Sequence, residues 1–344
     1  MVFFTCSLNQ DSLKCLLIMQ TNKPQIKSLQ LSSPVLLAPM AGITSLPYRR
    51  IMKAFGAGLV FSEMISSNGL IRDGKKTRLL LTTHKDEFPL GIQLFGDDPS
   101  VLSEAAQILK DESSLLDINM GCPVKKVVRS GAGSALLQDP LRVGQILAAV
   151  RKVYFGPLTI KIRSGWDDQS LNFLEIGRIA EAEGVDAVTL HPRPRSQGFS
   201  GKARWEHIAE LKTALNIPVF GSGDIFSTED GLNMFQQTGC DAVMIGRGGY
   251  GNPWLIRQII EGLTGKPVTH PSLLEKYQIA THHLQLHYKQ FGEKKTLLEM
   301  RKHLCWYARG LEGASHFRAV LQKTDRLDQV RELTKMFFSQ SEAV

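Results

Sequence analysis

Paired cysteines and long apolar runs are both missing from this sequence of 344 residues. Its five cysteines are Cys6, Cys15, Cys122, Cys240 and Cys305. None of them belongs to a C-x-x-C motif, and their odd number argues against a disulfide framework, so we expect a reducing, cytoplasmic setting. No apolar run reaches the length of a membrane span, and the first residues lack the basic start of a signal peptide. The sequence therefore predicts a protein with no membrane contact.

Acidic residues are in the minority. Lysine and arginine number 41 against 33 aspartates and glutamates, which gives a net charge of +8. Such a balance suits a phosphate-rich partner such as nucleic acid, although basic proteins without one are common. Residues 255–344 hold 14 of the basic and 9 of the acidic residues, so most of the surplus lies there. This segment is either a nucleic-acid surface or an ordinary solvated helical face.

Short runs of β-branched and aliphatic residues recur along the chain and predict strands. They cover residues 35–40, 59–64, 89–96, 115–121, 158–163, 186–192, 217–223 and 241–247. The segments between them carry apolar residues at helical spacing, often with Asp, Ser or Thr before the helix and Gly after it. Parallel strands need crossover helices, so eight such units predict an α/β fold of the (β/α)8 TIM barrel type. A doubly wound open sheet is the alternative.

The pattern changes after Pro253, and residues 271–340 show helical periodicity without strands. We therefore expect three parts: a flexible leader over 1–28, a catalytic barrel over 29–265 and a small all-α helical bundle over 266–344. The bundle contains three closely spaced histidines, His282, His283 and His287. They have no acidic residue nearby in the sequence, so we expect them on a helix face and predict no metal site.

Glycine-rich turns follow the seventh and eighth predicted strands, as GSGD at 221–224 and GRGG at 246–249. Glycine lets the backbone approach a ligand closely, and successive N–H groups at a turn bind anions. The same two loops form the usual phosphate site of a TIM barrel, and Arg247 adds a candidate charge-assisted bond. The turns therefore predict a phosphate site, with ligand-free structural turns as the alternative.

Three further side chains at the predicted strand ends carry chemistry. Lys161 interrupts an apolar strand, where a buried ammonium needs an anion, although a lysine reaching out to the rim is the alternative. His191, at the end of the sixth strand, is by itself more often structural than catalytic. Cys122 lies in a rigid Gly-Cys-Pro turn, and three cations follow within seven residues. These surroundings favour a thiol that gives or takes a proton, whereas a buried structural cysteine is the commoner role.

Several motifs are more specific than these patterns. They are APMAGIT (38–44), SEM (62–64), DINMGCPVKKV (117–127), KIRSGW (161–166), MIGRGGYGNPW (244–254) and RKHLCWYARGL (301–311). Together they resemble the tRNA-dihydrouridine synthases, most closely the bacterial B-type branch. The resemblance runs from about residue 25 to 335. It implies an FMN-binding barrel, a helical tRNA-binding domain, and reduction of a tRNA uridine to 5,6-dihydrouridine with NADPH as reductant.

The resemblance also implies a set of cofactor-binding residues. They are Pro39, Met40, Ala41, Gln93, Lys161, His191, Ser222, Gly223, Asp224, Gly246 and Arg247. The first three would line the flavin ring through their backbone, Gln93 would bond its polar edge, and Lys161 would face N1 and O2. The others would hold the ribityl phosphate. Ser222 replaces the asparagine usual in the family, but backbone N–H groups make most of such a nest, so we still expect FMN to bind.

For the substrate, the resemblance implies that Asn119 and Arg163 bind a uracil flipped out of the tRNA stack. Hydride would pass from flavin N5 to uracil C6, and Cys122 would protonate C5 as general acid. Two alternatives remain open: an FMN barrel oxidoreductase acting on a free pyrimidine or similar metabolite, and a non-catalytic RNA-binding protein. The basic helical segment argues against the first, and the retained site residues argue against the second. We expect a monomer.

Overall fold

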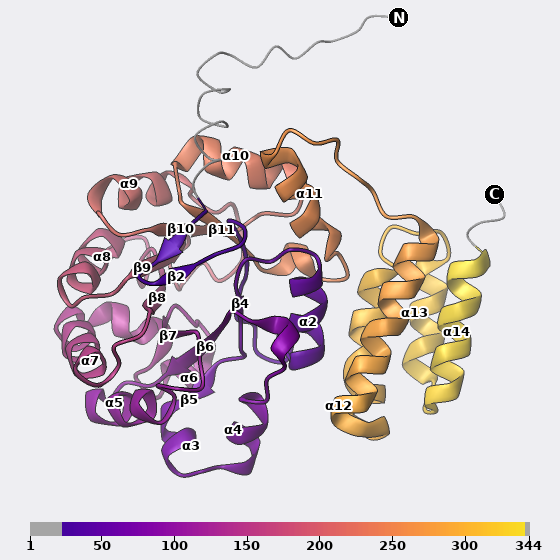
Figure 1. Ribbon diagram of the computed structural model, residues 1–344, viewed down its shortest axis with the longest axis horizontal. Helices are drawn as coiled ribbons and strands as arrows, with labels where there is room; N and C mark the ends of the chain where they lie inside the picture. Colours follow the sequence, from indigo (N-terminus) through magenta and orange to yellow (C-terminus); the bar gives the residue numbers. More distant parts are fainter. Residues whose placement is uncertain (1–22, 341–344) are drawn as a thin grey trace, which may run out of the picture.

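The computed structural model describes residues 23–340, which form a barrel followed by a helical domain (Figure 1). The barrel strands, in sheet order, are β3 (Val35–Leu37), β11 (Ala242–Ile245), β10 (Val219–Ser222), β9 (Ala187–His191), β8 (Leu158–Arg163), β7 (Leu115–Met120), β6 (Leu90–Phe95) and β4 (Val60–Phe61). All neighbouring pairs in this order are parallel. The eight predicted runs therefore all supply barrel strands.

The barrel closes between its first and second strands. Leu36 and Leu59 form a parallel bridge, and the Leu37 N–H donates to the Leu59 carbonyl at 2.9 Å. A short strand, β5 (Ile65–Ser66), continues from β4 and pairs with the end of β6. Because parallel strands are buried on both faces, their near-continuous apolar runs are what this fold needs. The predicted TIM barrel is confirmed.

Helices surround the strands. They are α2 (Leu46–Ala54), α3 (Ser67–Ile71), α4 (Lys75–Leu80), α5 (Pro99–Ile108), α6 (Lys125–Val128), α7 (Pro140–Val153), α8 (Phe173–Ala182), α9 (Glu206–Ala214), α10 (Thr228–Thr238) and α11 (Trp254–Leu263). Several begin at the caps that the sequence indicated. Asp98 accepts the Ser100 and Val101 N–H groups before α5, and Ser227 accepts the Asp230 N–H before α10. These caps fix where each strand-to-helix loop ends.

A hairpin precedes the barrel. It consists of β1 (Gln25–Ile26) and β2 (Leu29–Gln30), and the fully buried Ile26 and Leu31 pack into the interior cluster of the barrel. The boundary predicted after residue 28 therefore falls inside this hairpin. Residues 1–22 of the predicted leader lie outside the described residues.

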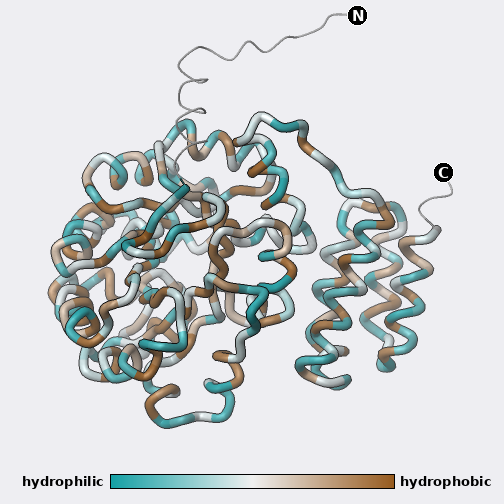
Figure 2. The backbone as a smooth tube through the Cα atoms, viewed as in Figure 1, coloured by the Kyte–Doolittle hydropathy of each residue, from teal (hydrophilic) through white to brown (hydrophobic). Residues whose placement is uncertain are grey.

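The helical domain consists of α12 (Leu273–Tyr307), α13 (Ala314–Lys323) and α14 (Leu327–Gln340). A left-handed φ of 75° at Gly292 interrupts α12. Figure 2 shows teal and brown alternating along these helices, as expected for helices with one buried face. The predicted boundary after residue 265 lies in the connection between α11 and α12.

The helical domain packs on the barrel beside α2 (Figure 1). The Tyr250 ring, at the barrel mouth, stacks on Trp306 of α12 with centroids 4.2 Å apart. Trp254 of α11 is buried in the hydrophobic core of the helical domain. Among residues 23–340, no helix is long and apolar enough to cross a membrane, and no cluster of His, Cys, Asp or Glu is arranged to hold a metal ion.

Candidate active site

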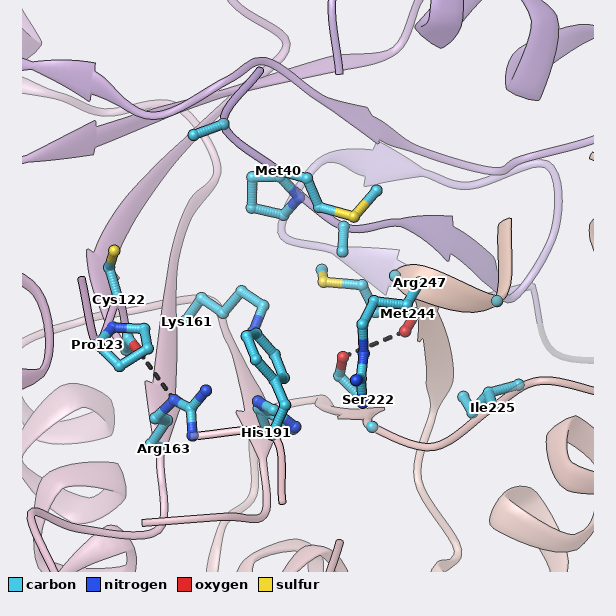
Figure 3. A pocket seen from close by; sticks show the side chains of 18 of the residues that line it. Met40, Cys122, Pro123, Lys161, Arg163, His191, Ser222, Ile225, Met244 and Arg247 are labelled. Atoms are coloured by element: carbon cyan, nitrogen blue, oxygen red, sulfur yellow. Dashed lines mark hydrogen bonds between the residues drawn. The ribbon is translucent and has the colours of Figure 1, made fainter. Parts of the chain in front are cut away.

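A cavity of about 330 Å³ opens where the barrel strands end. Figure 3 shows Cys122, Pro123 and Arg163 on one side of it and Ser222 and Arg247 on the other. Of the fourteen predicted site residues, all except Gln93 line this cavity. They are Pro39, Met40, Ala41, Asn119, Cys122, Lys161, Arg163, His191, Ser222, Gly223, Asp224, Gly246 and Arg247.

Cys122 follows β7 in a turn that is tightly bonded to its surroundings. Its N–H donates to Asn119 Oδ1 at 2.9 Å, and its carbonyl accepts from the Ser134 N–H and hydroxyl at 3.1 and 2.9 Å. Burial raises the pKa of the Cys122 thiol, although a hydrogen bond from the Val124 N–H and, to a smaller extent, the charges of Arg163 and Lys161 partly oppose this. A thiol that keeps its proton at neutral pH is suited to donate one.

Lys161 lies within β8 and reaches the cavity between the two sides (Figure 3). Its ammonium has no hydrogen-bond acceptor among residues 23–340. Desolvation lowers the pKa of Lys161 to about 8, with the nearby Arg163 adding to the effect. Asp117 and Cys122 act in the opposite direction. A half-buried cation without a partner among residues 23–340 is suited to an anionic ligand group.

Arg163 ends β8 and is almost fully buried. Its Nε donates to the Gly121 carbonyl at 3.0 Å, and its Nη1 donates to the carbonyls of Pro194 and Gly198 at 3.1 and 2.9 Å. Burial lowers the pKa of Arg163 to about 10, so it stays charged at neutral pH. Its Nη2 has no bond to the described residues, which leaves one donor group for a ligand in the cavity.

Gln93 and Asn119 lie deeper. Gln93 is completely buried; its Nε2 donates to Asp117 Oδ2 at 2.6 Å, and its Oε1 accepts from Asn119 Nδ2 at 2.8 Å. Asn119 Oδ1 accepts the N–H groups of Gly121 and Cys122. The structure therefore places Gln93 beneath the cavity wall, with both ends of its amide engaged by the protein.

The opposite side of the cavity consists of turns. Gly223 and Asp224 have positive φ values of 115° and 55°, and a Cβ added at Gly223 would lie 2.8 Å from the His191 ring. The Asp224 carboxylate accepts from Arg193 at 2.6 Å and from the Ala203 N–H at 2.8 Å. Only glycine meets both demands at position 223, since it tolerates this φ and has no side chain.

Arg247 and His191 complete this side. The Arg247 guanidinium lies 3.4 Å from the Asp224 carboxylate and over the Phe199 ring, 4.6 Å from its centroid. Desolvation and the neighbouring cations keep the pKa of His191 well below its usual value. The neutral ring meets Arg193 Nη1 at 3.2 Å through Nε2, and arginine only donates, so Nδ1 carries the proton. His191 thus offers a donor to an anion.

Two unpredicted residues shape the loop after β9. Arg193 is 1% exposed, and besides Asp224 it bonds the carbonyls of Ser200 and Gly201. Phe199 is 54% exposed at the cavity mouth, beneath the Arg163 and Arg247 guanidinium groups. Both signals were available in the sequence: a cation directly after a strand end, and an aromatic residue in an otherwise polar loop.

Asp117 was also missed. It lies inside the apolar run of β7, is 1% exposed, and accepts from Gln93 and from the Thr159 hydroxyl at 2.6 Å. Burial raises the pKa of Asp117 to about 6, and the two hydrogen bonds and Lys161 limit the rise. A carboxylate within an apolar strand is the same signal that singled out Lys161.

The fold and the cavity define a TIM-barrel enzyme whose mouth holds a protonated thiol, an ammonium without a partner among residues 23–340, and two glycine-containing turns. Residues 36–342 match the family model described as dihydrouridine synthase. The chain belongs to the dihydrouridine synthase family. It is therefore a flavin-dependent oxidoreductase that forms dihydrouridine.

Curated relatives cover nearly the whole chain. The tRNA-dihydrouridine synthase B of Pasteurella multocida is 44% identical over 317 residues, which is 91% of this chain and 95% of that protein. The tRNA-dihydrouridine synthase B of Pseudomonas aeruginosa is 39% identical over 312 residues, 90% of this chain and 94% of that protein.

Solved structures resemble the barrel at much lower identity. Histamine dehydrogenase from Rhizobium sp. 4-9 matches with a TM-score of 0.52 and 13% identity, covering 76% of this chain and 50% of that one. A 2-naphthoyl-CoA reductase matches with a TM-score of 0.52 and 14% identity, covering 70% and 51%. At this identity the likeness concerns the fold alone.

Proposed function

We propose that this enzyme reduces a uridine base of tRNA to 5,6-dihydrouridine, with FMN as its flavin and NADPH as the source of electrons. The observation that carries the proposal is the composition of one cavity: Cys122, Lys161 and Arg247 lie around it together with two glycine-rich turns. Each of these features meets a separate requirement of the reaction. Cys122 supplies a proton, Lys161 supplies a positive charge near the flavin ring, and Arg247 and the two turns bind the phosphate.

The described residues fit FMN. The Lys161 ammonium lacks a protein partner, and a positive charge at N1 and O2 stabilises a reduced flavin. The turn at 222–224, the turn at 246–248, the Nδ1–H of His191 and Arg247 together offer donors to a phosphate. When bound, reduced FMN supplies the hydride that adds to uracil C6.

Gln93 has a narrower role than the family resemblance implies. Its amide is already bonded to Asp117 and Asn119, so in this conformation it supports the cavity wall from beneath. Asn119 lines the cavity while its Oδ1 holds the thiol turn. We propose that these two residues act on the reaction mainly through the geometry they impose.

The proton comes from Cys122. Its buried thiol gives the proton to C5, and the resulting thiolate is stabilised by Lys161 and Arg163 until it takes a proton from water. Arg163 Nη2 is the free donor for a uracil oxygen. Phe199, exposed at the mouth, offers a ring face on which a flipped base can stack.

The helical domain supports tRNA rather than a free pyrimidine as substrate. Residues 255–344 hold the larger part of the positive surplus, and the domain packs against the barrel beside the cavity mouth through Tyr250 and Trp306. Binding through phosphates releases counterions, so tRNA affinity should fall steeply as salt rises. Affinity independent of salt would count against this role of the domain.

The test is mass spectrometry of the RNA product. The purified enzyme, FMN and NADPH are incubated with unmodified tRNA, with tRNA from cells lacking this gene, and with free uridine. A gain of two hydrogens at a mapped uridine of tRNA is expected, together with no reduction of free uridine. Reduction of free uridine but not tRNA would instead identify an enzyme of free pyrimidines.

A further inference from the structure

A chain of hydrogen bonds runs beneath the cavity from a carboxylate to the thiol turn. Its members are the side chains of Asp117, Gln93 and Asn119, which we call the relay. Gln93 Nε2 donates to Asp117 Oδ2 at 2.6 Å, and Asn119 Nδ2 donates to Gln93 Oε1 at 2.8 Å. Asn119 Oδ1 accepts the Cys122 N–H at 2.9 Å and the Gly121 N–H at 3.2 Å.

The two ends of the relay fix its direction. An ionised carboxylate can only accept, and a backbone N–H can only donate. Each of the two amides between them has one donating and one accepting end, so a single orientation of both satisfies every bond. Turning Gln93 over would set its carbonyl oxygen against the Asp117 carboxylate. Turning Asn119 over would set its NH2 group against the Cys122 N–H.

Water has little access to repair such a mismatch. The exposed fractions are 1% for Asp117, 0% for Gln93 and 6% for Asn119. A buried polar group without a partner costs free energy, so the orientation of each side chain in the relay fixes the orientation of the others. The Thr159 hydroxyl donates to the remaining Asp117 oxygen at 2.6 Å and completes the anchor.

A buried carboxylate is an expensive way to fill space, because an apolar side chain of similar volume usually serves stability as well or better. Asp117 is the one ionisable member of the relay; burial raises its pKa, and the hydrogen bonds from Thr159 and Gln93 and the charge of Lys161 oppose this only in part. Its place at the start of the relay therefore suggests a role in geometry.

We propose that Asp117 is a positioning residue: its carboxylate orients both amides of the relay and thereby holds the turn that presents the Cys122 thiol. This inference rests on the proposed role of Cys122 as the proton donor. Asp117 itself lies behind the cavity wall and does not touch the reacting atoms. Its loss should slow the proton step without weakening tRNA binding.

An exchange of the acidic and amide groups between positions 93 and 117 tests the direction of the relay. In Gln93→Glu, two carboxylates meet across the 2.6 Å bond and either repel or share one proton that both groups can donate, so the fixed direction of the relay is lost. We expect kcat to fall about 100-fold, the scale of a small misplacement of a reacting group. In Gln93→Glu with Asp117→Asn, the new amide at position 117 can donate to the new carboxylate at position 93, which still accepts from Asn119. The Thr159 hydroxyl then donates to the oxygen of the new amide.

The double variant is therefore expected to recover at least tenfold in kcat over Gln93→Glu, with KM for tRNA unchanged in all variants. A second readout is the rate at which iodoacetamide alkylates Cys122, followed by peptide mass spectrometry without flavin. We expect Gln93→Glu to change this rate and the double variant to restore it. A double variant no better than Gln93→Glu in both readouts overturns the proposal.

Two controls separate this result from other failures. Thr189→Val changes a threonine of β9 that is equally buried and has no hydrogen-bond partner for its hydroxyl among residues 23–340, so both readouts should stay at the wild-type level. The wild type and Cys122→Ala are assayed alongside. An inactive wild type would refute the proposed function, whereas an active wild type without rescue refutes only the role of Asp117.

Discussion

The two sides of the cavity are built on different physical principles. On the thiol side, at the ends of β7 and β8, side chains hold one another: Asn119 holds the Cys122 backbone, and Arg163 is bonded to three carbonyls. On the anion side, after β10 and β11, backbone conformation matters most, as the positive φ values of Gly223 and Asp224 illustrate.

This difference shows which atoms proton transfer and phosphate binding each require. Proton transfer requires one group with a suitable pKa at a defined position, so side-chain identity decides it. A phosphate is held by several N–H groups that every residue except proline carries, so the shape of the turn decides it. Substitutions should therefore be far more damaging on the thiol side, except where glycine permits the turn.

The largest effect is expected from Cys122→Ala. Removing the general acid should lower kcat about 1000-fold, the middle of the range for such groups, while FMN and tRNA affinities stay close to those of the wild type. Time courses of dihydrouridine formation measure the loss. Cys240→Ala is the matched control, because that thiol is also buried but lies outside the cavity, and its turnover should persist. Turnover of Cys122→Ala within about threefold of the wild type would refute the acid assignment.

The second expected effect concerns the stability cost of the charge on the thiol side. Burial raises the pKa of Asp117 from 3.8 to about 6. The folded state thus holds the proton more tightly than the unfolded chain. The contribution of Asp117 to the free energy of unfolding is therefore fully present below pH 3.8 and is lost as pH rises through about 6. At about 1.4 kcal/mol per pKa unit, the loss is about 3 kcal/mol.

Asp117→Asn removes this titration. The free energy of unfolding of the variant minus that of the wild type should therefore grow by about 3 kcal/mol from about pH 4 to about pH 7. Urea denaturation at a series of pH values measures this difference. If the difference in free energy of unfolding between the variant and the wild type does not vary with pH, ionisation of Asp117 does not destabilise the folded state.

On the anion side, Arg247→Met should raise the FMN dissociation constant about 10- to 100-fold, since a hydrogen bond to a charged group contributes about 1.5–3 kcal/mol. Methionine keeps much of the side-chain length but removes the charge. Fluorescence titration of FMN measures the change. Lys126→Met removes an exposed cation that does not line the cavity, and it should leave FMN affinity unaltered. Equal affinities of the Arg247→Met variant and the wild type would place the phosphate elsewhere.

The smallest effect is expected from Ser222→Ala. The Ser222 hydroxyl donates to the Met244 carbonyl at 3.2 Å, and the nest depends on backbone N–H groups, so FMN affinity should change less than about twofold. Gly223→Ala is the contrast at the next position, because its methyl group would meet the His191 ring and strain the turn. It should weaken FMN binding about tenfold. If both substitutions weakened binding equally, side chains rather than backbone would dominate this side.

Periodicity predicted most of the fold. Each barrel strand lies within one of the eight apolar runs, because parallel strands buried on both faces must be apolar almost throughout. The N-terminal hairpin was missed, since β1 and β2 are only two residues each and give no periodic signal. Its burial depends on Ile26 and Leu31 reaching the interior of a barrel that the rest of the chain forms.

The site was predicted mainly through motifs. Thirteen of its fourteen residues line one cavity, because strand ends of a parallel barrel converge on one face. Gln93 lies beneath that face, with both ends of its amide bonded to neighbours. Phe199, Arg193 and Asp117 each carry a local signal but were not singled out, because the contacts that show what they do join residues far apart in the chain.

The sequence by itself determined the barrel, the helical domain and the identity of the thiol, the ammonium and the glycine turns, because these depend on local patterns and on residue type. Only the tertiary structure decided which of the polar side chains face the cavity and which face one another. The order of donors from Cys122 through Asn119 and Gln93 to Asp117 is set by geometry across β6 and β7. No local pattern contains it, because hydrogen-bond direction is a property of groups brought together by folding.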